Sequence, residues 1–210
     1  MMARVDHTTT RGTFSLDGQT FDVDNNVWVI GDDTECVVVD APHDVDRIMR
    51  VVGDREVKAI LATHAHDDHV RVAPELSRRT GAPVLLHPDD LVVWRLTHPD
   101  TDPGGELADG QVIEVAGTAL HVLHTPGHAP GAVCFHAPDL NAVFTGDTLF
   151  HGGPGATGRS YSDFDTIIES ITDRLLTLPP DTVVHTGHGD DTTIGAEAPH
   201  RADWIARAAG

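Results

Sequence analysis

Basic side chains are scarce in this chain of 210 residues. Fourteen lysines and arginines face 33 aspartates and glutamates, which gives a formal net charge of −19. A surface this negative repels phosphate backbones and anionic lipid heads, and no local run of basic residues offsets it. We therefore expect neither a nucleic acid nor a membrane as a partner. The charge balance leaves the oligomeric state open.

Long apolar runs and cysteines are also scarce. No segment approaches the roughly 18 apolar residues of a spanning helix, and the opening MMARVDHTTT has no apolar stretch behind a basic one. The two cysteines, Cys36 and Cys134, lie inside apolar runs rather than at metal-knuckle spacing. Buried free thiols are therefore expected instead of a disulfide framework. Together these features predict a cytoplasmic protein.

Apolar residues make up 40% of the chain, which is enough for a sizeable core. No internal repeat or low-complexity linker divides the sequence, so we expect a single domain over residues 1–210. The apolar patterns predict strands and helices in alternation. The expected strands are 13–16, 27–30, 36–40, 57–62, 84–86, 111–115, 120–123, 133–136, 142–145 and 183–185, and the expected helices are 45–52, 70–79, 88–96, 164–176 and 200–208. Strands followed by helices, twice, predict an α/β fold of two facing sheets with helices outside.

The chain holds 15 histidines, and seven of them lie in three of four short segments that each follow an apolar strand, while the remaining segment supplies an aspartate. These segments are THAHDDH at 63–69, HTPGH at 124–128, FTGDTLF at 144–150 and HTGHG at 185–189. Loops at strand ends can converge on one edge of a sheet sandwich, where rigid strands position their side chains. The four segments therefore predict one shared site.

The spacing inside these segments predicts two neighbouring metal sites. His64 and His66 are two residues apart, so in extended chain their rings point the same way, while Asp68 and His69 are free to face a second ion. Asp147 is placed to lie between the two ions. The first ion is expected on His64, His66, His128 and Asp147, and the second on Asp68, His69, His188 and Asp147. Imidazole and carboxylate ligands suit zinc, iron(II) or manganese.

Each of these residues also has a structural interpretation. Asp68 could cap a helix, His128 could be a turn residue after a Pro-Gly pair, and His188 could be a polar residue between glycines. Four matched segments in order favour the metal site over these separate explanations.

Other histidines receive different expectations. His7, His43, His98 and His200 are expected at the surface or near a terminus. His124 and His185 either orient ligand imidazoles or are merely buried. His151, close to Asp147 in sequence, is a candidate to face the substrate.

The motifs resemble those of the metallo-β-lactamase superfamily. THAHDDH resembles its HxHxDH signature, and the later TPGH, GDTLF and GHG segments follow in the same order. The chain is most similar to the short, single-domain proteins of the glyoxalase II type. This resemblance implies an αββα four-layer sandwich and a binuclear metal centre, most simply with two zinc ions, in which Asp68 and Asp147 are the catalytic carboxylates.

Differences between this chain and other branches of the superfamily reduce the number of reactions that we expect of it. True β-lactamases of this fold usually have a cysteine where this chain has Asp147, and flavodiiron proteins have a glutamate where it has His66. Nucleases of the fold add domains or basic surfaces that a charge of −19 disfavours. A small thioester remains as the expected substrate. A metal-bridging hydroxide would attack its carbonyl, and the thiolate would leave without a strong acid.

Only 22 residues follow His188, so we do not expect the C-terminal glutathione-binding region of full-length glyoxalase II. Substrate contacts are instead expected from internal loops, chiefly loop 150–163, with loop 98–110 as a further candidate. Within loop 150–163, Arg159 could bind a substrate carboxylate and Tyr161 could offer its hydroxyl, although Arg159 could equally anchor the loop itself. Thirteen arginines against one lysine are typical of GC-rich coding. The thiol could accordingly be of the mycothiol type instead of the glutathione type.

Three other functions stay open at this point. A persulfide dioxygenase of the same fold would bind one iron through residues that correspond to His64, His128 and Asp147. A lactonase would use the same two-ion site on an acyl lactone. A metal-binding regulatory module would bind ions without turnover, although such a protein usually loses at least one ligand.

Overall fold

The computed structural model describes residues 2–208 and contains two six-stranded mixed sheets. In the first sheet, β1 to β3 pair antiparallel, and β3 to β6 pair parallel. Its strands lie in sequence order: β1 (Arg4–Leu16), β2 (Gln19–Gly31), β3 (Glu35–Val39), β4 (Glu56–Leu61), β5 (Val84–Leu86) and β6 (Gly105–Glu106).

The second sheet has the order β14-β13-β10-β9-β8-β7, in which only the β10–β13 pair is parallel. Its strands are β7 (Val112–Val115), β8 (Thr118–His124), β9 (Val133–Ala137), β10 (Ala142–Gly146), β13 (Val183–Thr186) and β14 (Thr192–Thr193). A separate small hairpin is formed by β11 (Leu149–Phe150) and β12 (Gly153–Pro154).

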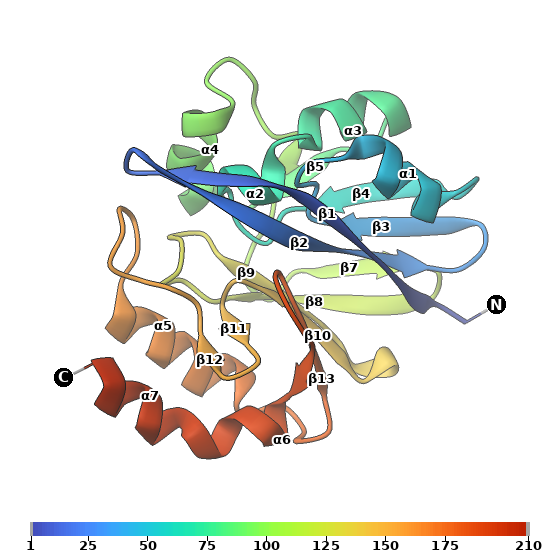
Figure 1. Ribbon diagram of the computed structural model, residues 1–210. Helices are drawn as coiled ribbons and strands as arrows, with labels where there is room; N and C mark the ends of the chain where they lie inside the picture. Colours follow the sequence, from blue (N-terminus) through green and yellow to red (C-terminus); the bar gives the residue numbers. More distant parts are fainter. Residues whose placement is uncertain (1, 209–210) are drawn as a thin grey trace.

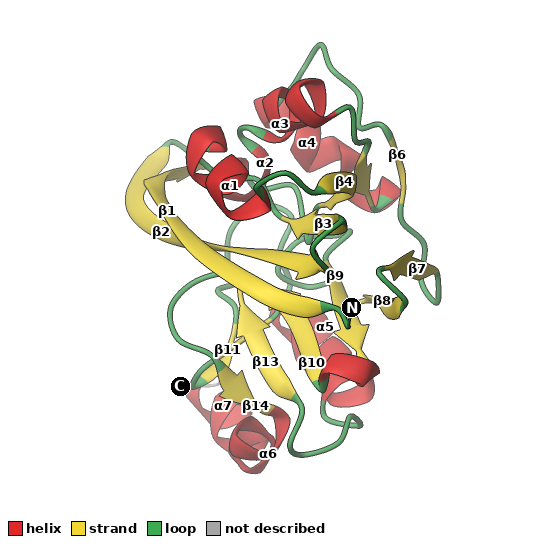
Figure 2. Cartoon of the chain, turned by 90° about the vertical axis from the view of Figure 1, so that its right-hand side faces the viewer, coloured by secondary structure: helices red, strands yellow, loops and turns green. Residues whose placement is uncertain are grey.

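Helices cover the outer face of each sheet, so the layers run helix, sheet, sheet, helix (Figures 1 and 2). The first sheet carries α1 (Val45–Val52), α2 (Asp67–Val70), α3 (Ala73–Thr80), the 3₁₀ helix η1 (Pro88–Asp90) and α4 (Leu91–Thr97). The second carries α5 (Phe164–Ser170), a π-helical turn η3 (Ile171–Leu175), α6 (Ile194–Glu197), the 3₁₀ helix η4 (Ala198–His200) and α7 (Arg201–Ala208). A further 3₁₀ helix, η2 (Pro138–Leu140), joins β9 to β10.

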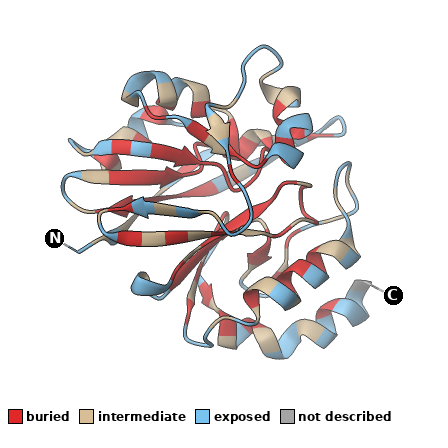
Figure 3. Cartoon of the chain, turned by 180° about the vertical axis from the view of Figure 1, so that it is seen from behind, coloured by how far each residue is buried: buried red, intermediate tan, exposed pale blue. Residues whose placement is uncertain are grey.

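Alternation along the strands explains why both faces of each sheet are buried. On β2, Val27 and Val29 pack under the helices of the first sheet, whereas Trp28 and Ile30 face the second sheet. On the second sheet, Phe144 points to the inter-sheet layer and Val143 to the outer helices. Figure 3 shows buried residues along the central strands and exposed residues on the outer helices. The sandwich therefore has three apolar layers.

Several elements differ from the sequence expectation. The first hairpin is much longer than its apolar runs, because the Thr-rich edge strand β1 is only partly buried and lacks an alternating pattern. Its turn at Asp17-Gly18, with positive φ at both residues, is the one the sequence indicates. The helix expected at 70–79 is two helices, since Pro74 starts a new first turn in α3. The helix expected at 164–176 ends as a π-helical turn.

Both cysteines are buried and unpaired, as expected. Among the residues that the structure describes, none of the helices has the length and apolar character required to cross a membrane.

Candidate metal centre

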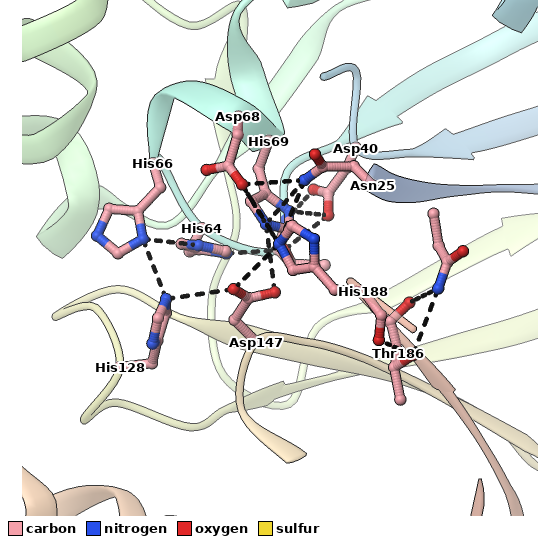
Figure 4. Close-up of polar contacts among 12 residues, drawn as sticks. Asn25, Asp40, His64, His66, Asp68, His69, His128, Asp147, Thr186 and His188 are labelled. Carbon is pink, nitrogen blue, oxygen red and sulfur yellow. Dashed lines mark hydrogen bonds and ion pairs between the residues drawn. The ribbon is translucent and has the colours of Figure 1, made fainter. Parts of the chain in front are cut away.

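The predicted ligands lie at the ends of strands from both sheets (Figure 4). Residues 63–69 follow β4 of the first sheet. His128 follows β8, Asp147 follows β10 and His188 follows β13, all in the second sheet. The sandwich thus brings all seven predicted ligands to one edge.

Three imidazoles form the first group. His66 presents its Nδ1 atom, and the Nε2 atoms of His64 and His128 each lie 3.0 Å from it. Asp147 Oδ2 lies 3.5 Å from His128 Nε2. His64, His66 and His128 are buried and could hold one ion together.

The second group contains Asp68, His69 and His188. His188 Nε2 lies 3.3 Å from both His69 Nε2 and Asp68 Oδ2. Asp147 Oδ1 lies 3.2 Å from His69 Nε2, and Asp147 Oδ2 lies 3.4 Å from His188 Nε2. Because the same Oδ2 atom approaches His128, Asp147 lies between the two groups, as the sequence predicts.

Backbone carbonyls set the orientation of two of these rings. His128 Nδ1–H donates to the carbonyl of Ala156 at 2.9 Å. His188 Nδ1–H donates to the carbonyl of Asp24 at 2.8 Å. In the singly protonated ring, which is the form that binds a metal, each bond leaves the Nε2 lone pair facing the centre.

Asp40 orients the rings of His69 and His64, directly in the first case and through Thr63 in the second. It accepts from His69 Nδ1 at 2.8 Å and from the Thr63 hydroxyl at 2.8 Å. Because the Thr63 proton goes to Asp40, the Thr63 oxygen accepts from His64 Nδ1 at 3.1 Å. When singly protonated, His64 and His69 therefore also present lone pairs on Nε2.

This convergence of acceptors fits a pair of cations. Several lone pairs and two carboxylates face one another, and the buried Asp147 Oδ1 atom has no hydrogen-bond partner among residues 2–208. Ligand atoms on a tetrahedral zinc ion lie about 3.4 Å apart, given zinc–nitrogen bonds of about 2.1 Å. The spacings of 3.0 to 3.5 Å match that value. Gly187 makes the approach possible, because a Cβ there would lie 2.3 Å from Asp147 Oδ1.

The two groups differ in the pKa values of their histidines. Burial lowers the pKa of His64 well below its usual value, and it lowers the pKa of His66 to about 3, so both rings are neutral. For His188, burial acts in the same direction, but the Asp147 charge and hydrogen bonds to Asp147 and Asp68 outweigh it and raise the pKa to about 10. The first group is thus a neutral nitrogen site, and the second is a site of charged pairs.

A cavity of about 510 Å³ opens beside the centre. Phe14, Phe21 and Phe150 line its apolar side, and Arg159 and His151 also line it. The Arg159 guanidinium packs over Phe14 and Phe21, with its central carbon 5.2 and 4.6 Å from their ring centroids. Its Nη1 atom is buried and has no hydrogen-bond partner among the residues that the structure describes.

Tyr161, by contrast, is 43% exposed and is not among the lining residues.

The model of the metallo-beta-lactamase superfamily matches residues 20–188. The chain belongs to this superfamily. The αββα sandwich expected for it is confirmed, because solved structures of the superfamily overlay on most of the chain.

Three relatives of the superfamily bear on the chemistry. A hydroxyacylglutathione hydrolase, GloC of Haemophilus influenzae, is 32% identical, covering 81% of this chain and 87% of its own. The crystal structure of TTHA1623 in a di-iron-bound form is 32% identical with a TM-score of 0.74, over 90% and 96% of the two chains. That of the BLEG-1 B3 metallo-beta-lactamase is 27% identical with a TM-score of 0.78, over 93% and 99%.

Several expectations for the remaining histidines are wrong. His43 is half-buried, and its Nε2 lies 2.9 Å from Asn25 Oδ1, close to the metal centre. His98 is also half-buried and bonds the Val70 carbonyl. Neither of these two histidines lies free on the surface.

The expected orienting role of His124 and His185 is not seen either. His124 Nε2 bonds the Pro130 carbonyl, and His185 Nδ1 bonds Asp191. Neither forms a hydrogen bond to a ligand imidazole within residues 2–208. Both rings serve the packing around the site.

Two residues near the centre were missed by sequence reasoning. Asp40 had a signal, since it is the charged residue that directly follows the apolar strand β3 at the same sheet edge. Asn25, whose amide donates to Asp68 Oδ2 at 3.1 Å, had none, because an Asn-Asn pair indicates a turn and here lies inside β2.

Proposed function

We propose that this member of the superfamily is a metallohydrolase that cleaves thioesters of small thiols, of the glutathione or mycothiol type. The observation that carries the proposal is the double group of ligands around Asp147, beside a cavity with room for a small molecule. The hydroxyacylglutathione hydrolase among the relatives supports the thioester, since a hydroxyacylglutathione is a thioester.

The ligands would divide between two divalent ions. His64, His66 and His128 would hold the first, Asp68, His69 and His188 would hold the second, and Asp147 would bind both. When bound, such a pair lowers the pKa of water held between the ions and polarises a carbonyl oxygen. Zinc is proposed first, with iron or manganese as alternatives.

The chain itself would bind and orient the substrate. Arg159 has a buried Nη1 without a partner and no salt bridge within the described residues, so it would take a carboxylate of the substrate. His151 would contact the same molecule from the opposite end of loop 150–163, and Tyr161 would reach it only after a rotation toward the cavity. A thiolate leaves as a weak base, so no side chain has to protonate it.

The test combines metal content with turnover. The purified chain is loaded with zinc, manganese or iron(II), its metal is counted by mass spectrometry, and hydrolysis is measured on a hydroxyacylglutathione, the matching mycothiol thioester, an acyl lactone and a β-lactam. We expect two ions per chain and fastest cleavage of a thioester. The Asp147→Asn variant should lose at least about 100-fold of the activity, whereas Asp139→Asn, in η2, should retain it.

Other outcomes overturn the proposal. One iron per chain with oxygen uptake on a thiol persulfide identifies a dioxygenase. Faster cleavage of the lactone or of the β-lactam identifies a different hydrolase. No turnover by the metal-loaded chain on the whole panel identifies a regulatory module.

A further inference from the structure

Asp90 is a fully buried carboxylate that contacts no predicted ligand. It lies at the end of η1, directly before α4. Its Oδ2 atom accepts the backbone N–H of Ala65 at 2.5 Å, and its Oδ1 atom accepts that of Gly131 at 2.6 Å. It forms no salt bridge in residues 2–208. Burying a charge without a cation is costly, so these two amides must supply much of its stabilisation.

The two amides belong to the two loops that build the first group. Ala65 lies between His64 and His66, and Gly131 lies three residues after His128. The first loop follows β4 of the first sheet, and the second joins β8 to β9 of the second sheet. Asp90 therefore bridges the two sheets at the metal centre.

The geometry at Gly131 shows how close this bridge is. A Cβ at Gly131 would lie 2.5 Å from the Asp90 backbone nitrogen and 2.8 Å from Asp90 Cβ. Within the first group, the 3.0 Å approach of His66 Nδ1 to His128 Nε2 spans the same two loops. One further bond, from Val133 N–H to the Thr63 carbonyl at 2.8 Å, joins them at the strand ends.

We propose that Asp90 is a positioning residue that fixes the His64–His66 loop to the His128 loop and so sets the affinity of the first group for its ion. The inference rests on the proposed two-ion site. We expect the second group to be unaffected, because Asp68 and His69 lie in helix α2, after the His64–His66 loop, and His188 follows β13.

An isosteric substitution separates this role from simple packing. In Asp90→Asn, one of the two facing N–H groups meets an amide NH₂ in place of an oxygen, so one bond is lost while the volume stays the same. Gly131→Ala is the second variant, because it keeps the carboxylate but pushes the His128 loop away from Asp90 by steric overlap. Either variant that folds tests the idea.

The experiment measures each ion separately by competition with a zinc chelator. The His188→Ala background leaves the first group intact, and the His128→Ala background leaves the second. We expect Asp90→Asn to weaken zinc binding about 10- to 100-fold in the first background and to leave it unchanged in the second. In the metal-free chain, hydrogen exchange of the Ala65 and Gly131 amides should accelerate selectively in Asp90→Asn.

Glu197→Gln is the matched control. Glu197 is also a buried carboxylate, and it accepts from Gly152 N–H at 3.1 Å and from the Thr192 hydroxyl at 2.7 Å, in neither metal loop. It should leave both zinc affinities unchanged. The inference is overturned if Asp90→Asn and Gly131→Ala both bind zinc as tightly as the unmodified chain. It is also overturned if both groups lose zinc affinity equally, or if Glu197→Gln shows the same loss of zinc affinity. An unmodified chain that binds none of zinc, manganese and iron(II) overturns the proposed function along with it, whereas two bound ions with no effect of Asp90→Asn overturn the inference alone.

Discussion

His43 stands in a polar network beside the metal centre and has one nitrogen to spare. Its Nε2 bonds Asn25 Oδ1, while its Nδ1 is buried and finds no partner within residues 2–208. Burial lowers the pKa of His43 to about 4, with Arg71 acting in the same direction and Asp68 opposing. More weakly, His69 also lowers this pKa and Asp67 raises it. The ring is therefore neutral at physiological pH.

This depressed pKa predicts acid sensitivity. A histidine with an unfolded pKa near 6.5 and a folded pKa of about 4 stabilises the fold above pH 6.5, and that contribution is lost as the pH falls through 4. Allowing for partial exposure, the loss is about 2 kcal/mol. We therefore measure the free energy of unfolding in urea for the metal-free chain at pH 7.5 and pH 4.5. Between these two pH values, the free energy of unfolding should fall less in His43→Gln than in the unmodified chain, by the amount just given. The exposed His200→Gln should behave like the unmodified chain, and identical curves for all three would exclude the role of His43.

At the scale of elements, the sequence predicted those helices and strands whose apolar residues recur at a regular spacing. The spacing of Val45, Ile48 and Val52 predicted α1 with its observed ends, and apolar runs located the central strands. The site could be predicted because its ligands sit directly after such strands. Asn25 and Asp90 could not be predicted as part of it, because their partners lie 43 and 41 residues away and only the packed sandwich brings them together.

The hairpin β11–β12 was missed for a related reason. Its strands are two residues each inside a glycine-rich segment, so no period exists to recognise. Glu197 fixes its turn by accepting the Gly152 N–H, a contact between distant parts of the chain.

The β1–β2 hairpin is the element that shapes the cavity. Phe14 and Phe21 pair across its strands, and Asp17 at its tip accepts the Ser160 N–H at 3.0 Å. Both rings lie against Arg159, so the hairpin holds the cation at the cavity wall.

Removing one ring should therefore act on substrate binding. For a thioester that carries a carboxylate, we expect Phe21→Ala to raise KM about 3- to 10-fold while kcat changes little, because a cation–π contact of about 1 kcal/mol orients Arg159. Adding Arg159→Ala to this variant should raise KM less than it does in the unmodified chain. Steady-state kinetics of the four chains measures this, with Val112→Ala on β7 as an exposed apolar control. A fall in kcat with unchanged KM would contradict the argument.

Across the whole molecule, the metal centre joins two halves that are also joined by packing. The first sheet contributes residues 63–69, and the second contributes His128, Asp147 and His188. Between the sheets lies the apolar layer that contains Trp28, Phe135 and Phe144. Bound cations would also offset part of the self-repulsion of a chain with a net charge of −19.

Metal removal should accordingly lower stability without abolishing the fold. An ion present at about 1,000 times its Kd stabilises the native state by about 4 kcal/mol, and the inter-sheet layer remains when the ion is gone. We expect calorimetry to show a lower Tm after treatment with EDTA, still with one cooperative transition. The His128→Ala and His188→Ala chains, each with one group left, should show a smaller decrease in Tm on EDTA treatment. Asp147→Ala, which lacks the shared ligand, should show the smallest decrease. A Tm that EDTA does not change in the zinc-loaded chain would show that the centre does not tie the two sheets together.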